Sequence, residues 1–144
     1  MIRASILVTI IIIGGFLLEP ALAGQAFVLT GRYDLKNGAQ QGTLYVKELP
    51  GKKISFSIQS EWIGDAKMGN VNVGEADGTV PVAGNVAVYK GTGFKLTFTF
   101  SPATCKVVLS GEPSTYGGMN VDPNGTYRKT SKSAPTKEQL NPES

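Results

Sequence analysis

Apolar residues recur at every second position over most of this chain. In the segment from Lys53 to Trp62, apolar side chains fall on one face and polar side chains on the other, and Phe94–Ser101 repeats this pattern. A period of two is typical of a β-strand with one buried face. Because the opposite faces are polar, the pattern favours an antiparallel sheet with one face in water over a parallel sheet buried on both faces.

Weaker segments of the same kind complete the predicted sheet, and no stretch after residue 23 shows a helical period. The strands that we predict are Phe27–Leu35, Thr43–Leu49, Lys52–Ile63, Asn70–Val73 with its continuation Glu75–Val82, Asn85–Lys90, Phe94–Ser101, Thr104–Ser110 and Gly125–Thr130. About eight short strands joined by glycine-rich turns predict an all-β fold, an antiparallel meander that closes, or nearly closes, into a β-barrel. A two-sheet β-sandwich is the alternative.

The two ends of the chain differ from this pattern. Residues 1–23 combine Arg3, an uncharged apolar run from Ile6 to Leu18 and the small-residue exit Ala21-Leu22-Ala23, which is typical of a signal peptide. We therefore expect a periplasmic or secreted protein that begins at Gly24 and is not held in a membrane after cleavage. An uncleaved membrane anchor is the alternative. Residues 24–130 form the predicted β-barrel domain, and the polar residues 131–144 predict a disordered tail.

Composition removes several classes of chemistry. The chain has no histidine, which excludes Ser-His-Asp triads, Cys-His pairs and histidine metal sites. Its only cysteine, Cys105, alternates with Val107 and Leu109, so we interpret it as a buried apolar residue and not as a link between subunits. The net charge of +3 is spread along the sequence, so no nucleic-acid partner is expected.

Carboxylates offer one weak catalytic candidate. Glu75 and Asp77 are two residues apart on a strand, so their side chains share a face, as in a general acid/base pair or a pair of calcium ligands. The sequence Glu75-Ala76-Asp77-Gly78 also has the composition of a solvated turn, which is the interpretation that we prefer. We predict no catalytic residue, no metal and no cofactor, and keep a hydrolase using Glu75 and Asp77 as an alternative.

Glycine and tyrosine are repeated at the two ends of the domain. Gly31-Arg32-Tyr33 lies in the first predicted strand and Gly125-Thr126-Tyr127 in the last. In a closed meander these strands pair, and each tyrosine ring is expected to lie over a glycine of the neighbouring strand. The arrangement resembles calycin-type barrels and is similar to the small exported barrels that include bacterial lysozyme inhibitors. Such inhibitors insert a loop into the cleft of the enzyme, and the nearest stretch here is Lys90–Lys95.

Function is predicted from the loops. We expect a non-enzymatic, exported binding protein that presents Gly64–Gly69, Lys90–Gly93 and Glu112–Asn124 from one rim to a protein or glycan partner, with lysozyme inhibition as its most specific form. The candidate binding residues are Trp62, Asp65, Lys67, Lys90, Phe94, Tyr116 and Tyr127. The alternative is a carrier of one small apolar ligand in the barrel, with walls formed by Phe56, Trp62, Phe98 and Tyr127.

Overall fold

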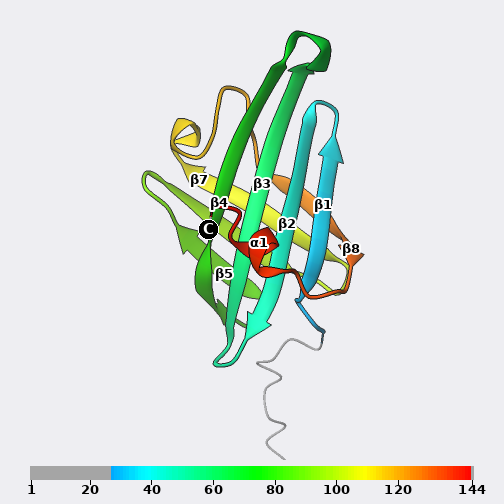
Figure 1. Ribbon diagram of the computed structural model, residues 1–144. Helices are drawn as coiled ribbons and strands as arrows, with labels where there is room; N and C mark the ends of the chain where they lie inside the picture. Colours follow the sequence, from blue (N-terminus) through cyan, green and yellow to red (C-terminus); the bar gives the residue numbers. More distant parts are fainter. Residues whose placement is uncertain (1–26, 144) are drawn as a thin grey trace, which may run out of the picture.

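The protein is an eight-stranded, closed β-barrel in which each strand pairs antiparallel with the next along the chain (Figure 1). This computed structural model describes residues 27–143. The strands are β1 (Gly31–Asn37), β2 (Gln40–Leu49), β3 (Lys53–Asp65), β4 (Asn70–Ala83), β5 (Val86–Lys90), β6 (Phe94–Phe100), β7 (Thr104–Gly111) and β8 (Gly125–Ser131). Pairing of β8 with β1 closes the barrel. The predicted closed meander is confirmed, and the sandwich alternative is wrong.

In a simple meander, every second connection between strands lies at the same end of the barrel. The connections after β1, β3, β5 and β7 therefore share one end, which we call the upper rim; it consists of residues 38–39, 66–69, 91–93 and 112–124. The β3–β4 hairpin is the longest, and it extends past its neighbours at the top of Figure 1. A short 3-10 helix, η1 (Ala66–Met68), forms its tip.

The interior of the barrel is filled by the apolar faces of the strands. Phe56 of β3 and Phe98 of β6 contact each other across the interior, with ring centroids 4.9 Å apart. Tyr33 and Phe100 pack edge to face at 6.0 Å. The fully buried residues also include Leu29, Leu44, Val46, Ile54, Ile58, Leu96, Cys105, Val107 and Tyr127. Burial of the Cys105 side chain confirms its interpretation as a core residue.

The glycine–tyrosine contacts differ from those that we predict from the sequence. Tyr127 points into the barrel and reaches past β1, and its ring lies over Gly42 of β2. Gly31 instead faces the backbone oxygen of Ser131, and Gly125 faces the side chain of Leu35. The reason is the register, because Tyr33 of β1 pairs with Lys129 and not with Gly125. The glycines at the two ends therefore allow close backbone and side-chain approach, and they do not support rings.

The C-terminal segment is folded, where the sequence analysis predicts a disordered tail. Helix α1 (Lys137–Leu140) contacts β2 and β3 on the outside of the barrel (Figure 1). Thr136 caps this helix, accepting a hydrogen bond from the Gln139 amide at 3.2 Å, and the Gln139 side chain accepts one from the Thr136 amide at 2.8 Å. Because residues 131–144 are polar, the sequence analysis predicts disorder there, although Thr136 and Gln139 have the spacing of a capping box. Pro135, just before it, is buried against the barrel.

We expect Gly42→Ala to destabilise the protein by about 1–3 kcal/mol, the usual range for overpacking a filled core. A Cβ at this position would lie 2.5 Å from the Tyr127 hydroxyl oxygen and 2.8 Å from its Cε1. Urea unfolding measures the change. In a Tyr127→Leu background the same glycine substitution should cost much less, and an equal cost in both backgrounds would show that the ring contact is not the cause.

Candidate functional site

The meander brings the three loops that the sequence analysis selects to the same end of the barrel. Gly64–Gly69 is the tip of the β3–β4 hairpin, Lys90–Gly93 joins β5 to β6, and Glu112–Asn124 joins β7 to β8. The upper rim is therefore assembled from segments far apart in the sequence. It is our candidate functional site.

The longest rim loop, Glu112–Asn124, is held by hydrogen bonds to the rim ends of β4 and β2. Gly117 forms an isolated antiparallel bridge with Gly74 of β4, and the Asn72 side chain donates to the Met119 carbonyl at 2.8 Å. From β2, the Gln40 side chain donates to the Asn120 carbonyl at 2.5 Å. The loop thus lies across the end of the barrel and has a fixed backbone.

This loop covers a gap in the sheet. β4 and β5 pair only through Val82 with Ala87 and Ala83 with Val86, so the upper part of β4 has no neighbouring strand on that side. Aromatic rings fill the space: Tyr89 lies 6.1 Å from Phe94, and Phe94 lies 5.4 Å from Tyr116, between ring centroids. Phe94 is therefore half-buried in a row of rings between the barrel and the loop.

Tyr116 anchors the loop. Its ring is buried, and its hydroxyl shares a 2.8 Å hydrogen bond with the Ser60 hydroxyl and donates to the Gly74 carbonyl at 3.3 Å. Gly74 has no side chain, which leaves room for the ring. Burial raises the pKa of Tyr116 well above its usual range, because the ring has little water to stabilise a phenolate.

Tyr127 fixes the other end of the same loop. Its hydroxyl donates to the Pro123 carbonyl at 3.0 Å, and burial raises its pKa to about 12. Tyr116 and Tyr127 were both selected as partner-binding residues, but neither ring is accessible in this structure. They belong to the interior and position the loop. Their spacing in sequence gives no sign of this role.

The remaining candidates lie on the rim itself. Asp65 accepts hydrogen bonds from the amides of Lys67 and Met68 at 3.0 and 3.4 Å, so it shapes the hairpin tip while Lys67 stays exposed. Trp62 is half-buried, with its ring over Gly64. Lys90 is exposed at the end of β5. Of the seven candidates, Asp65, Lys67 and Lys90 are open to a partner.

Exposed apolar side chains on the rim are the feature that the sequence analysis missed. Met68 is 81% exposed at the hairpin tip, and Met119 is 77% exposed on the long loop. Val71 and Val73 of β4 are also exposed nearby. The sequence carries a signal for the two methionines, since each stands beside glycine in a polar loop. An open hollow of about 500 Å³ beside Met119 is lined by Leu109 and residues of the long loop.

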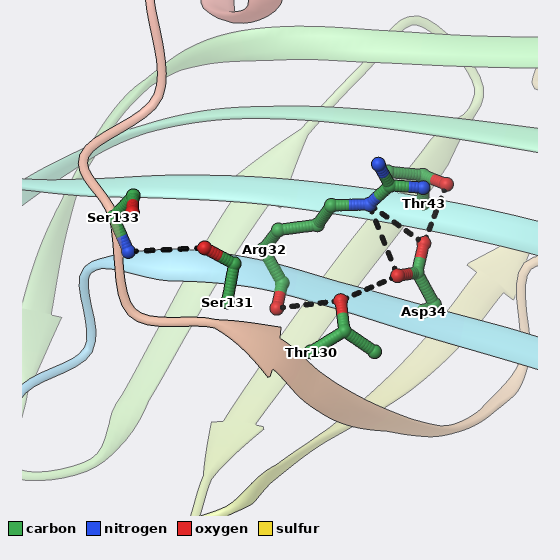
Figure 2. Close-up of polar contacts among 6 residues, drawn as sticks. All are labelled: Arg32, Asp34, Thr43, Thr130, Ser131 and Ser133. Atoms are coloured by element: carbon green, nitrogen blue, oxygen red, sulfur yellow. Dashed lines mark hydrogen bonds and ion pairs between the residues drawn. The ribbon is translucent and has the colours of Figure 1, made fainter.

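A separate polar cluster on the outer wall joins β1, β2 and β8 (Figure 2). Asp34 accepts hydrogen bonds from Thr130 at 2.5 Å, from Thr43 at 2.8 Å and from Arg32 at 3.0 and 3.1 Å. Partial burial acts to raise the pKa of Asp34, but these hydrogen bonds and the Arg32 charge outweigh it and lower the pKa. Because the donors come from three neighbouring strands, the cluster links β8, β1 and β2 where the barrel closes.

Three comparisons give no further information on identity. The chain matches no protein-family model, no curated protein and no solved structure. Within residues 27–143, no group of three or more acidic or cysteine side chains is placed to hold a metal ion. No helix of that part of the chain is long and apolar enough to cross a membrane.

Tyr116→Phe tests the loop anchor. We expect a loss of about 1–2 kcal/mol in the free energy of unfolding, because the Ser60 hydroxyl loses its buried partner. Amide exchange at Gly118, which donates to the Val73 carbonyl, should become faster. Tyr89→Phe is the matched control, since the half-buried Tyr89 hydroxyl makes no hydrogen bond within residues 27–143. Equal effects of both changes would contradict the anchor.

The buried tyrosines also predict alkaline instability. Burial raises the pKa of Tyr127 to about 12 and raises those of Tyr33 and Tyr116 too, whereas an unfolded tyrosine ionises near pH 10. Below about pH 10 both states keep these protons; above it the unfolded state binds fewer, so stability falls as pH rises, by up to about 1.4 kcal/mol per pH unit for each tyrosine. Urea midpoints from pH 8 to 12 measure this fall, and Tyr127→Phe should make it shallower. A constant midpoint above pH 10 would contradict it.

Proposed function

We propose that this chain is an exported, non-enzymatic binding protein that presents its upper rim to a protein partner. The observation that carries the proposal is the pair of exposed methionines, Met68 and Met119, on a rim whose longest loop is held in place. Export follows from the signal-peptide pattern of residues 1–23, which lie outside the described part of the chain.

The fixed loop favours binding because little conformational entropy is lost in ordering it when a partner binds. Gln40 and Asn72 hold the loop backbone from two strands, and Tyr116 holds it from below. Side chains and loops that are ordered before contact lose less conformational entropy on association. A loop that served only to connect β7 and β8 would not need to be thirteen residues long (Glu112–Asn124) or tied so often.

The chemistry of the rim suits a protein surface. Methionine is a flexible, polarisable side chain that is frequent at binding surfaces. Asp65, Lys67 and Lys90 add exposed charges of both signs to the loops and strand ends of the same rim. An apolar centre with a polar border is the usual anatomy of a protein interface. A glycan partner is the second form of the same proposal, for which the rim offers the open hollow beside Met119, where Glu112, Asn120 and Asp122 supply polar groups.

Packing inside the barrel argues against the ligand-carrier alternative. The proposed wall residues Phe56 and Phe98 contact each other, and Tyr127 occupies the space over Gly42. These rings would have to separate before a ligand could enter. The packing of the barrel does not support the hydrolase alternative either, because Glu75 and Asp77 lie on the exposed outer face of β4.

Lysozyme inhibition is the most specific version of this function and is directly testable. A purified chain should slow the clearing of a bacterial cell-wall suspension by lysozyme, and the double variant Met68→Ala/Met119→Ala should weaken lysozyme binding at least about tenfold, as expected for removing two central apolar contacts. The matched control is Val28→Ala/Val108→Ala, which removes exposed apolar side chains outside the rim.

The results of these experiments distinguish the lysozyme version of the proposal from the general one. Loss of inhibition in the rim variant alone supports the proposal in its specific form. If the wild-type chain does not inhibit, the lysozyme version is wrong, and photo-crosslinking from position 119 and from position 108 in an envelope extract tests the general one. A crosslinked partner at position 119 only supports rim binding, whereas equal crosslinking at both positions contradicts it.

A further inference from the structure

Two adjoining hollows lie on the outer wall of the barrel, where the C-terminal segment rests on β3 and β4. Their volumes are about 220 and 150 Å³. Both are lined by Ser57, Glu75 and Pro142, so they form one continuous depression. In Figure 1 the C-terminal segment lies outside the barrel, with α1 in front of β2 and β3 and the chain end drawn over β4. We call it the tail hollow.

The tail hollow is acidic, although the whole chain carries a charge of +3. Glu75 and Asp77 reach it from β4, Glu138 from α1 and Glu143 from the chain end. None of these four carboxylates forms an ion pair within residues 27–143. Glu75 accepts only a long, 3.5 Å hydrogen bond from Gln59. Negative charge from three separate segments is therefore gathered here without a cationic partner, and only Glu138 is stabilised locally, because hydrogen bonds to its own backbone and to Thr136 lower its pKa.

Ser57, a largely buried residue, presents its hydroxyl to the tail hollow. Ser57 is on the outer face of β3, beside Asp77 in the sheet register, and is only 7% exposed because the C-terminal segment covers it. Its side chain has no hydrogen-bond partner among residues 27–143, and it lines both hollows. Within residues 27–143 no buried side-chain N or O atom lacks a partner, so the unpaired Ser57 hydroxyl is accessible from the hollow and can accept a hydrogen bond from a donor outside the chain.

We propose that the tail hollow binds the primary ammonium end of an aminoalkyl chain. Such a group has three donors and one positive charge, which suit the Ser57 hydroxyl together with Glu75 and Asp77. A bare metal ion fits less well, because no three acidic groups of the described residues are close enough to coordinate one. This site is on the wall of the barrel, so it does not depend on the function proposed for the rim.

The same ammonium chemistry has two sources, a free polyamine and a lysine side chain of another protein. The four carboxylates favour a ligand with more than one amine, since a second ammonium group can then pair with Glu138 or Glu143. Most of these carboxylates are exposed, so the attraction is screened by salt. We therefore expect binding that is strongest at low ionic strength.

Calorimetric titration of the full chain with spermidine, and with a short peptide containing two lysines, tests the proposal. Glu75→Gln/Asp77→Asn should weaken binding of at least one probe about tenfold or more, and Ser57→Ala should weaken it by a smaller factor, in the range of one neutral hydrogen bond. The matched control is Glu61→Gln/Glu112→Gln, which removes two negative charges elsewhere and should change affinity less than about twofold. Thermal unfolding confirms that each variant is folded.

The outcomes are distinct. Tighter binding of spermidine than of the peptide identifies a free polyamine as the source, and the reverse identifies a protein lysine. Equal weakening by the control variant would show only general charge attraction and would overturn the site. Absence of binding of both probes at low salt would overturn it as well. Neither result bears on the rim, which carries none of Ser57, Glu75 and Asp77.

Discussion

The upper end of the barrel depends on a contact between a ring and a glycine. β4 leaves β5 after two residue pairs, and the gap that results is filled by Tyr89, Phe94 and Tyr116. Tyr116 fits only because Gly74 has no side chain at the point of contact. The hydrogen bonds of its hydroxyl then connect the long loop to β3 and β4. Without this ring, the loop would lose its hydrogen bonds to Ser60 and the Gly74 carbonyl, and the space beside Phe94 would be left unfilled.

The same device recurs at other places in the barrel. Tyr127 over Gly42, Tyr89 over Gly78 and Phe94 over Gly91 each combine a large ring with a residue that lacks a side chain. A barrel of eight strands has limited interior width, so a large ring beside a nearby strand or turn needs a position without a side chain. Glycine in a strand weakens the strand, but here each one makes room for a ring. The glycine-rich composition therefore reflects packing as well as turns.

The fold could be predicted from the sequence because it depends on a local pattern. Alternation in Lys53–Trp62 and Phe94–Ser101 shows which faces are buried, and the number of strands then favours closure. The site was predicted in part. Loop position follows from the meander, but the burial of Tyr116 and Tyr127 depends on a register and a strand divergence that no short segment encodes. The C-terminal helix was missed although its capping box, Thr136 to Gln139, is a local motif that the sequence contains, whereas the burial of Pro135 depends on the folded chain.

The rim and the tail hollow would bind through different interactions, burial of apolar side chains at the rim and charge attraction at the hollow. This difference is a reason to regard them as separate sites. The rim offers apolar side chains on a backbone that is fixed before contact, so its affinity would come from burying Met68 and Met119 and would change little with salt. The tail hollow offers exposed carboxylates around the unpaired Ser57 hydroxyl, so its affinity would fall as salt is added. Asp34, also on the wall, shows what the hollow lacks, because Arg32, Thr43 and Thr130 already satisfy its charge. The charge of Asp34 therefore stabilises the fold, whereas Glu75 accepts only the long hydrogen bond from Gln59 and neither Glu75 nor Asp77 pairs with a cation within residues 27–143.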